Sequence, residues 1–333
     1  MNRFTYVDCA TVDEALSQMQ GDAVVKAGGI DLLDLMKDGV VTPPKLVNIR
    51  NVHTLHRIEV SESGLRLGPL VTLTEIAEHP QIQKHYAALA DAAGHAATPQ
   101  VRNMATVGGN LMQRPRCWYF RSSEFDCRKK GNSDECHALQ GENQYHAIVN
   151  NSTCAMVHPS STAVPLLAME AEVELTSKAG KRTLAMSDFY IAPEEDLQHE
   201  TAVKPGELIT AIRVPAPAAG TRSAYQKYGE KESFDWPLAD AGVVLTMDGN
   251  TCRKAAIVLG VAAPTPIHAT EAEAALRGKT INEQTAREAG KLAVAKATPL
   301  SQNGYKVQLF QTAVYRTILL AAGQMGRDPS AIG

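Results

Sequence analysis

The chain has 333 residues, of which 44% are hydrophobic and 21% charged, with a formal net charge of −3 and a pI of about 6.4. This composition is ordinary for a soluble globular protein, and the length allows two or three domains with their own cores. The balanced charge excludes the strongly basic surface typical of nucleic-acid-binding proteins, and no apolar run approaches the roughly 20 residues of a membrane span. We therefore expect neither nucleic acid binding nor membrane insertion.

Short helices and strands are predicted to alternate over residues 1–90. Thr11 to Gln20 predicts a helix, because Thr11 is a good N-cap and Glu14 completes a capping box. The segment Val24-Val25-Lys26-Ala27 predicts a strand that runs into Gly28-Gly29, and apolar residues at helical spacing follow it. Further strands are predicted at residues 46–49 and 65–67.

The rest of the chain divides at a segment rich in Pro, Gly and small residues, 214–223, which we predict to be a linker. Before it lie an apolar run at residues 163–169 and a strand at 172–175. After it the pattern predicts buried strands at 239–247 and 255–261 and helices at 271–276, 283–297 and 305–322. Mixed α/β structure in two domains follows from this order.

Two glycine pairs, Gly28-Gly29 and Gly108-Gly109, favour a cofactor site. Each follows a small or apolar run and precedes residues able to begin a helix. Glycine permits close backbone approach to a ligand, and successive N–H groups in such a turn bind anions, helped by a helix N-terminus. Two such loops could hold one pyrophosphate, although each pair could also be only a tight turn. The G-x-G-x-x-G motif of a Rossmann site is absent.

Four of the six cysteines lie in one polar segment, at positions 117, 127, 136 and 154. Their spacing matches neither C-x₂₋₄-C zinc pairs nor the familiar ferredoxin patterns. Six basic residues nearby would stabilise the negative charge of an iron–sulfur cluster. These are Arg114, Arg116, Arg121, Arg128, Lys129 and Lys130. An iron–sulfur cluster, an unusual zinc site, two disulfides, or unrelated thiols beside solvated cations all remain compatible with the pattern.

The N-terminal segment MNRFTYVDCATVDEAL has no apolar core of a signal peptide. We therefore expect the chain to stay in the compartment where it is made unless a partner carries it elsewhere. A reducing cytosol disfavours the disulfide interpretation.

Four segments in order resemble one family: AGGIDLL, ATVGGNLMQR, GELITAIRVPAP and GVAAPTPIHATEAEAALRG. Over essentially the whole chain, the sequence resembles the FAD-binding (medium) subunit of the molybdenum hydroxylases, the xanthine dehydrogenase and carbon monoxide dehydrogenase family. The cysteine-bearing insertion, which begins RPRCWYF, is most similar to the FAD subunit of bacterial periplasmic aldehyde oxidoreductase, which carries an additional 4Fe-4S cluster.

The resemblance implies an α+β, or mixed α/β, fold with two parts. Residues 1–216 would form a two-part FAD-binding domain of the PCMH type, with a 4Fe-4S-binding insertion at about 112–156. Residues 222–328 would form a smaller C-terminal α/β domain of the carbon monoxide dehydrogenase flavoprotein type.

The resemblance also implies the site residues. FAD would be bound at Lys26, Ala27, Gly28, Gly29, Ile30, Asp31, Leu32, Leu33, Thr106, Gly109, Asn110, Leu111, Gln113, Ser161, Leu208, Ile209 and Lys227. One 4Fe-4S cluster would be bound by Cys117, Cys127, Cys136 and Cys154. The family usually has Thr at the position of Ile30 and Asp at that of Ser161, so one hydroxyl contact and one carboxylate charge are missing here. Cys9 and Cys252 are expected to be ordinary buried residues.

The implied function is electron transfer within a heteromeric molybdenum hydroxylase, an aldehyde oxidoreductase or oxidase. Partners would be a large molybdopterin-binding subunit and a small 2Fe-2S subunit. No side chain here is an obvious general base for substrate chemistry, so no catalytic residue is assigned. The resemblance favours the periplasm, reached by co-export with a signal-bearing partner, and otherwise the cytoplasm. The alternatives are a zinc-stabilised, non-redox assembly module and a free-standing flavin oxidoreductase.

Overall fold

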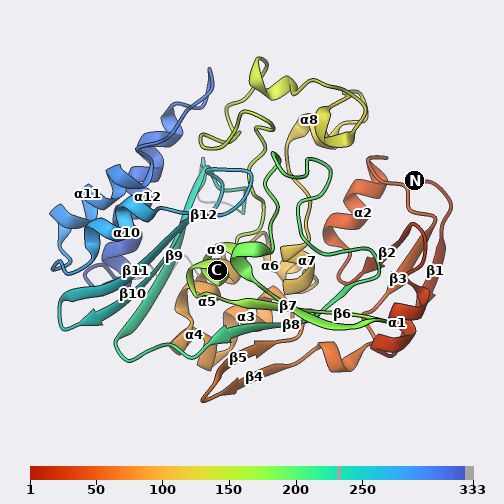
Figure 1. Ribbon diagram of the computed structural model, residues 1–333, viewed down its shortest axis with the longest axis horizontal. Coiled ribbons are helices and arrows are strands. Elements are labelled where there is room, and N and C mark those ends of the chain that lie inside the picture. Colours follow the sequence, from red (N-terminus) through yellow and green to blue (C-terminus); the bar gives the residue numbers. More distant parts are fainter. Residues whose placement is uncertain (231–233, 327–333) are drawn as a thin grey trace.

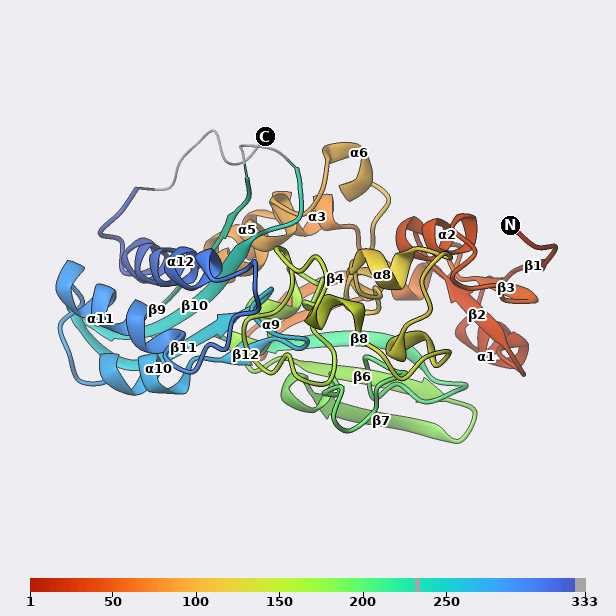
Figure 2. The same cartoon turned by 90° about the horizontal axis from the view of Figure 1, so that it is seen from above.

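Three β-sheets follow one another along the chain and across the molecule (Figure 1). The computed structural model describes residues 1–230 and 234–326. Seen from above, the N-terminal sheet and the C-terminal helices lie at opposite ends, with the largest sheet between them (Figure 2). The mixed α/β class predicted from the sequence is confirmed.

The N-terminal sheet has three parallel strands in the order β1-β3-β2. They are β1 (Thr5–Asp8), β2 (Ala23–Lys26) and β3 (Lys45–Asn48), connected by helices α1 (Val12–Gln18) and α2 (Ile30–Lys37). The predicted capping box begins α1, because Thr11 Oγ1 accepts from the N–H of Glu14 at 3.1 Å and the Glu14 carboxylate accepts from the N–H of Thr11 at 3.3 Å. A local sequence signal thus fixes the start of this helix.

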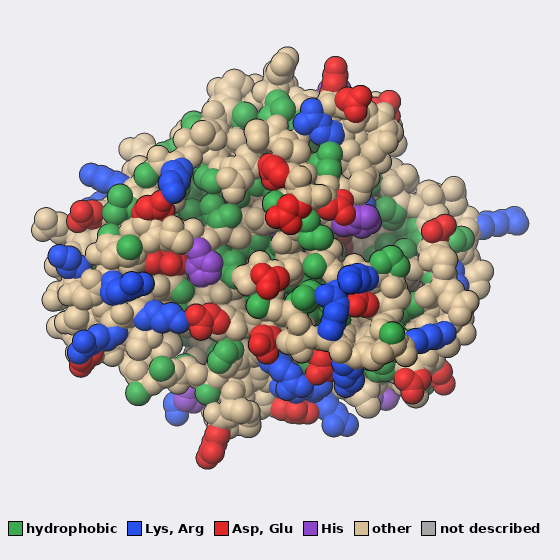
Figure 3. Space-filling model, in the orientation of Figure 1, with side chains coloured by type: hydrophobic (Ala, Val, Ile, Leu, Met, Phe, Trp, Pro, Cys, Tyr) green, Lys and Arg blue, Asp and Glu red, His purple; other side chains and the backbone are tan. Residues whose placement is uncertain are grey.

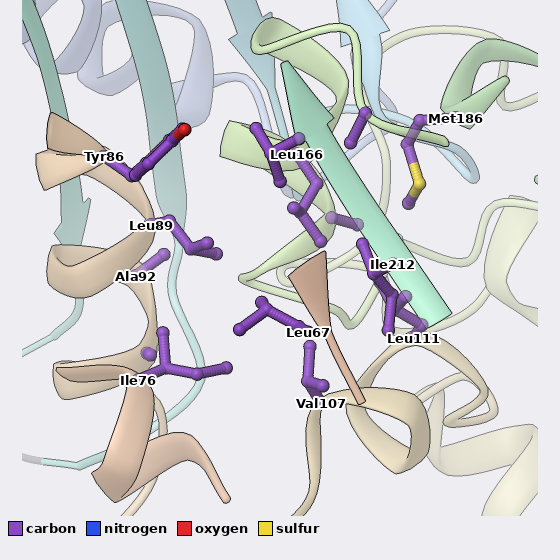
Figure 4. Packing of buried hydrophobic residues seen from close by; sticks show 14 of the residues in the cluster. Leu67, Ile76, Tyr86, Leu89, Ala92, Val107, Leu111, Leu166, Met186 and Ile212 are labelled. Carbon is purple, nitrogen blue, oxygen red and sulfur yellow. The ribbon is translucent and has the colours of Figure 1, made fainter. Parts of the chain in front are cut away.

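The central sheet has five antiparallel strands in the order β4-β5-β8-β6-β7. They are β4 (Ile58–Ser61), β5 (Gly64–Leu67), β6 (Glu172–Ser177), β7 (Gly180–Ala185) and β8 (Leu208–Pro215). The helices of this region are η1 (His53–Leu55), α3 (Leu73–Glu78), α4 (Pro80–His85), α5 (Ala87–Gly94), α6 (Pro99–Arg102), α7 (Val107–Leu111), α9 (Ala163–Ala168) and η4 (Met186–Asp188). Side chains of α3, α5, α7 and α9 meet those of the sheet in the largest hydrophobic cluster, where Leu67, Leu111 and Ile212 are fully buried (Figure 4).

The cysteine-bearing segment leaves the central layer as a loop that contains only short helices, at the top of Figure 1. These are α8 (Trp118–Arg121), η2 (Arg128–Lys130) and η3 (His137–Leu139). The loop closes on itself where the N–H of Ala147 donates to the carbonyl of Ala155 at 2.9 Å. We call residues 112–156 the cysteine insertion.

The C-terminal part is an antiparallel sheet, ordered β12-β11-β10-β9, packed with three helices. Its elements are β9 (Thr221–Tyr228), β10 (Ala239–Asp248), β11 (Thr251–Leu259), β12 (Ile267–His268), α10 (Thr270–Leu276), α11 (Glu283–Ala293) and α12 (Tyr305–Ala321). The predicted apolar stripe of Phe310, Val314 and Ile318 is fully buried. The predicted linker is shorter than expected, because β8 continues to Pro215 and β9 begins at Thr221.

Positive and negative side chains are interspersed over the face of the molecule shown in Figure 3. Among the residues that the structure describes, none of the helices has the length and apolar character needed to cross a membrane.

Candidate functional site

The first glycine loop connects β2 to α2 at the edge of the N-terminal sheet. Gly29 precedes the helix with φ of +83°, a left-handed conformation that favours glycine. A Cβ atom on Gly29 would lie 3.2 Å from both Leu33 Cδ1 and Lys26 Cε, so even a methyl group would be crowded. The loop therefore requires glycine for its backbone conformation.

The start of α2 leaves a row of backbone donors free. Within residues 1–230 and 234–326, no protein acceptor is hydrogen-bonded to the backbone N–H of Gly28, Gly29, Ile30, Asp31 or Leu32. By contrast, Thr11 caps α1 with its hydroxyl oxygen. Unpaired N–H groups at the start of a helix carry partial positive charge and bind anions such as phosphate. The arrangement fits one face of a pyrophosphate.

The second glycine loop begins next to the first one. A Cβ atom on Gly28 would lie 2.0 Å from the carbonyl oxygen of Met104 and 3.5 Å from Ala105 Cα, so only glycine allows this approach. The structure thus brings together two segments that are far apart in the sequence. The two predicted loops lie side by side at this point.

The second loop uses its own backbone donors within the protein. The N–H of Gly108 donates to the carbonyl of Pro69 at 2.9 Å, and the N–H of Gly109 donates to Thr106 Oγ1 at 3.2 Å. Both glycines lie within the short helix α7 rather than in a loop ahead of it. The hypothesis of an amide nest therefore applies to the first glycine pair, whereas the N–H groups of Gly108 and Gly109 already have protein acceptors.

Polar side chains surround the second loop. Asn110 Oδ1 accepts from the hydroxyls of Ser160 at 2.7 Å and Thr162 at 2.6 Å, which orients the amide. The Oγ of Ser161 is buried, and the part of the chain that the structure describes offers it no hydrogen-bond partner. A buried polar atom without a partner is costly, so a ligand at this point would be stabilising. Gln113 ties the loop to the cysteine insertion by donating to the Asn110 carbonyl and accepting from Arg116.

Other residues predicted to bind FAD include lysines hydrogen-bonded within the protein and apolar side chains buried in hydrophobic clusters. Lys26 Nζ donates to Asn48 Oδ1 at 3.2 Å, and partial burial lowers the pKa of this lysine. Leu208 and Ile209 are each 5% exposed and pack within hydrophobic clusters, as does Leu111, which is fully buried. Lys227 lies in β9, where its ammonium group donates to the carbonyl of Asp235 at 3.1 Å and burial lowers its pKa.

Asp31 connects the first glycine loop to the cysteine insertion. Its carboxylate accepts from Arg116 and Arg121, both at 2.7 Å, and from the backbone N–H of Arg114 at 2.9 Å. The residue was predicted to bind FAD, but three protein donors engage its side chain. The backbone N–H of Asp31, which has no protein acceptor in the described residues, is therefore the group that could bind a cofactor. Sequence reasoning gave no indication of this contact, because the partners are up to 90 residues apart.

The four clustered cysteines line one pocket in the insertion, together with Tyr119, Phe120 and Met156. Cys117, Cys127 and Cys136 each immediately precede a short helix. The sulfur of Cys117 accepts from the amides of Tyr119 and Phe120 in the helix that follows it. The sulfur of Cys136 accepts from Ala138 and Leu139 of its own helix and from Ala155. Such contacts stabilise thiolates. All six cysteines are free thiols, so the disulfide alternative is wrong.

The thiols differ in acidity. Burial raises the pKa of Cys117 to about 12, whereas a hydrogen bond from Cys154 lowers the pKa of Cys136 to about 6. The same hydrogen bond, with burial, raises the pKa of Cys154. A fifth residue, His146, was missed by sequence reasoning: its Nε2 lies 3.2 Å from Cys117 Sγ. Burial, followed by the charge of Lys306, lowers the pKa of His146 to about 4.

The basic residues of the insertion make contacts that hold the loop, and Arg128 and Lys129 also line the cysteine pocket. Arg114 and Lys129 pair with Glu200 at 3.0 and 2.9 Å. Arg128 donates to the carbonyls of Asp134 and Thr153. The carboxylates of Asp31 and Glu200 offset only part of the positive charge of the six basic residues, because Arg128 and Lys130 donate to uncharged carbonyls.

The four clustered cysteine thiols are the candidate ligands of a metal group. In the described ranges no three His, Cys, Asp or Glu side chains are arranged as a site for a metal ion. The four thiols nevertheless line one pocket, and the sulfur atoms of Cys117 and Cys136 accept from backbone N–H groups, as ligands of a four-cysteine iron–sulfur cluster do. The pocket has a volume of about 20 Å³. The four thiols that line it fit the donor set of a four-cysteine cluster.

Residues 2–217 match the family described as FAD binding domain in molybdopterin dehydrogenase. The chain belongs to the FAD-binding medium subunits of the molybdenum hydroxylases. Residues 223–321 match the carbon monoxide dehydrogenase flavoprotein C-terminal domain. The protein is therefore an FAD-binding subunit of an oxidoreductase, as the resemblance implied.

Among curated relatives, the aldehyde oxidoreductase FAD-binding subunit PaoB of Escherichia coli is 35% identical, covering 97% of this chain and 100% of that one. The carbon monoxide dehydrogenase medium chain of Hydrogenophaga pseudoflava is 28% identical, covering 97% and 94%. Among solved structures, quinoline 2-oxidoreductase from Pseudomonas putida has a TM-score of 0.76 at 26% identity, covering 98% and 99%. These similarities span almost the whole length of the chain.

Proposed function

We propose that the chain is the electron-transfer subunit of a heteromeric aldehyde oxidoreductase, in which it passes electrons from iron–sulfur clusters through FAD to an external acceptor. The 35% identity to the E. coli aldehyde oxidoreductase subunit supports the substrate class. The observation that carries the proposal is the row of free N–H groups from Gly28 to Leu32 beside the second glycine loop. That row is suited to the pyrophosphate of FAD.

In this proposal each element of the site has a role toward the cofactor. The first glycine loop holds the pyrophosphate on its amides, and Lys26 adds positive charge beside it. Asn110 and Ser161 offer polar atoms from the second loop, while the buried β8 residues Leu208 and Ile209 make the neighbouring wall rigid. Bound flavin supplies the exchange of electrons, and the protein binds it, orients it and excludes water.

We also propose one 4Fe-4S cluster, with Cys117, Cys127, Cys136 and Cys154 as its ligands. The shared pocket and the backbone N–H donors to sulfur support this assignment. The insertion is polar and contains only helices of three or four residues, so packing alone orders it weakly. Metal–thiolate bonds would add the missing cross-links.

Iron and acid-labile sulfide in single variants test the cluster. Cys136→Ser should lose most of the about four irons per chain. Cys252→Ser is the matched control, because Cys252 is fully buried in the C-terminal cluster and should leave the iron content unchanged. Full iron in Cys136→Ser, or zinc without sulfide in the unmodified protein, would contradict the assignment.

The proposed partners are a large molybdopterin-binding subunit and a small 2Fe-2S subunit. Relatives named as medium chains or medium subunits support an assembly of several chains. We propose that the chain reaches the periplasm by co-export with a signal-bearing partner. Fractionation of cells that lack the small subunit tests this, because the chain should then remain in the cytoplasm, and periplasmic chain in those cells would contradict it.

Anaerobic mixing of the purified complex with an aldehyde tests the electron-transfer role. The visible flavin bands should bleach, and an added acceptor should restore them. A Gly29→Val complex depleted of FAD should still reduce its iron–sulfur clusters but should lose turnover with the acceptor. Turnover that survives the loss of FAD would contradict the role, and an active chain that elutes alone in size-exclusion chromatography would contradict the assembly.

A further inference from the structure

His146 lies at the end of the cysteine insertion, with its side chain directed at one of the four clustered thiols. Its Nε2 is 3.2 Å from Cys117 Sγ, a hydrogen-bonding distance for sulfur, although the two residues are 29 positions apart. The residue is 3% exposed, so water does not compete for this contact. Across the described parts of the chain, no other side-chain nitrogen is hydrogen-bonded to the sulfur of Cys117, Cys127, Cys136 or Cys154.

The backbone at His146 is held from outside the insertion. Its carbonyl accepts from Lys306 Nζ at 3.0 Å and from Asn303 Nδ2 at 3.1 Å, both at the start of α12. Lys306 is fully buried and also donates to the carbonyl of Val261 at 3.0 Å. The C-terminal domain therefore fixes the position of the histidine independently of the sulfur contact.

The ring of His146 is fixed as well. The Trp118 ring packs against it edge-on, with centroids 5.3 Å apart. Trp118 directly follows Cys117, so the same contact aligns the imidazole with the sulfur. A ring that is buried, anchored and aligned in this way has little freedom to turn away from the thiol.

We propose that His146 is a positioning residue that donates a hydrogen bond from Nε2 to the Cys117 thiolate and thereby raises the reduction potential of the cluster. This inference rests on the 4Fe-4S cluster proposed above. A thiolate bound to iron has no proton, so the imidazole must be the donor in this contact. The partial positive charge of the N–H favours the reduced cluster, which carries one more negative charge. The sulfur contact thus makes the cluster a better electron acceptor.

A redox titration of three variants, followed by the electron paramagnetic resonance of the reduced cluster, tests the proposal. His146→Phe keeps an aromatic ring but removes the donor, so the midpoint potential should shift to more negative values with the iron content unchanged. His146→Gln places an amide donor near the position of Nε2, so the potential should return toward that of the unmodified protein. His137→Phe is the matched control: His137 Nε2 contacts the carbonyl of Asp126 at 2.8 Å instead of a sulfur, so the potential should not move.

The outcomes separate this proposal from the cluster assignment. Full iron and an unchanged potential in His146→Phe would overturn the role of His146 while leaving the cluster in place. If His146→Phe loses the cluster, His146→Gln decides: a potential like that of the unmodified protein supports the donor role, whereas a shifted potential or a lost cluster overturns it. Unmodified protein without iron and sulfide would overturn the cluster assignment itself.

Discussion

Gly28 lies against Met104 and Ala105, at the start of the segment that carries Gly108-Gly109, but the backbone N–H groups of the two glycine pairs are used differently. The first pair stands ahead of α2 and opens a run of N–H groups without protein acceptors in the described ranges. The second pair lies inside α7, where Pro69 and Thr106 accept from its amides. Two identical dipeptides therefore have separate tasks, one presenting donors and the other permitting close packing.

The comparison shows what a glycine pair can and cannot indicate. Gly29 is required for its positive φ, whereas Gly108 is required because a Cβ atom there would lie 2.7 Å from Pro69 Cβ. An anion site needs unpaired donors in addition to small residues. If this distinction is right, equivalent substitutions in the two loops have unequal effects on FAD.

Gly29→Val should have the largest effect. A β-branched residue at φ of +83° costs about 1–3 kcal/mol, and relief of that strain would turn the amides away. If this strain is present only in the FAD-bound protein, it subtracts from the free energy of binding, and FAD affinity drops roughly 5- to 150-fold. Titration of FAD into the FAD-free protein measures this loss. Gly249→Val is the control, because Gly249 has φ of +58° with open space around it in the C-terminal domain. An equal loss of affinity in both variants would contradict the distinction.

Asp31→Asn should have an intermediate effect on both cofactor sites. Asn keeps the size of the side chain but removes the charge that holds Arg116 and Arg121, contacts worth about 1.5–3 kcal/mol each for charged hydrogen bonds. We expect lower thermal stability and partial loss of both FAD and iron. Asp248→Asn is the control, since its pair with Arg253 is exposed. Loss of one cofactor with full retention of the other would show that Asp31 does not couple the sites.

Gly109→Ala should have the smallest effect. Its new Cβ would lie 3.1 Å from Thr106 Oγ1, a contact that a slight shift of the hydroxyl relieves. The helical backbone accepts alanine at least as well as glycine, with a gain of about 0.5–1 kcal/mol to offset the crowding. We expect FAD affinity to change much less than in Gly29→Val, measured by the same titration. A loss as large as that of Gly29→Val would show that the second loop contributes equally.

The elements that sequence could predict are those with local causes. The capping box of α1 and the apolar stripe of α12 depend on residues within a few positions of one another, and both were found where expected. Strands β8 and β9 were not predicted, and the predicted linker at 214–223 overlaps both, because pairing with neighbouring strands rather than a local apolar pattern defines them. The first glycine pair was found ahead of a helix as expected, whereas the second lies inside α7. The Gly108 amide is not free because it donates to Pro69, more than 30 residues away in the chain.

The links between the sites were beyond sequence reasoning. Asp31 reaches the insertion through arginines up to 90 residues away, and His146 reaches Cys117 across 29 residues. No spacing rule covers such contacts, because they arise only when separate segments pack together. The cysteines themselves were indicated by their grouping, although their gaps match no standard ligand pattern.

A structure of the chain with FAD bound tests the central claim most directly. We predict that the pyrophosphate oxygens lie within hydrogen-bonding distance of the N–H groups of Gly28 to Leu32, and that the N–H groups of Gly108 and Gly109 keep Pro69 and Thr106 as acceptors. A pyrophosphate bound to the amides of the second loop, with those of the first loop still free, would contradict the account.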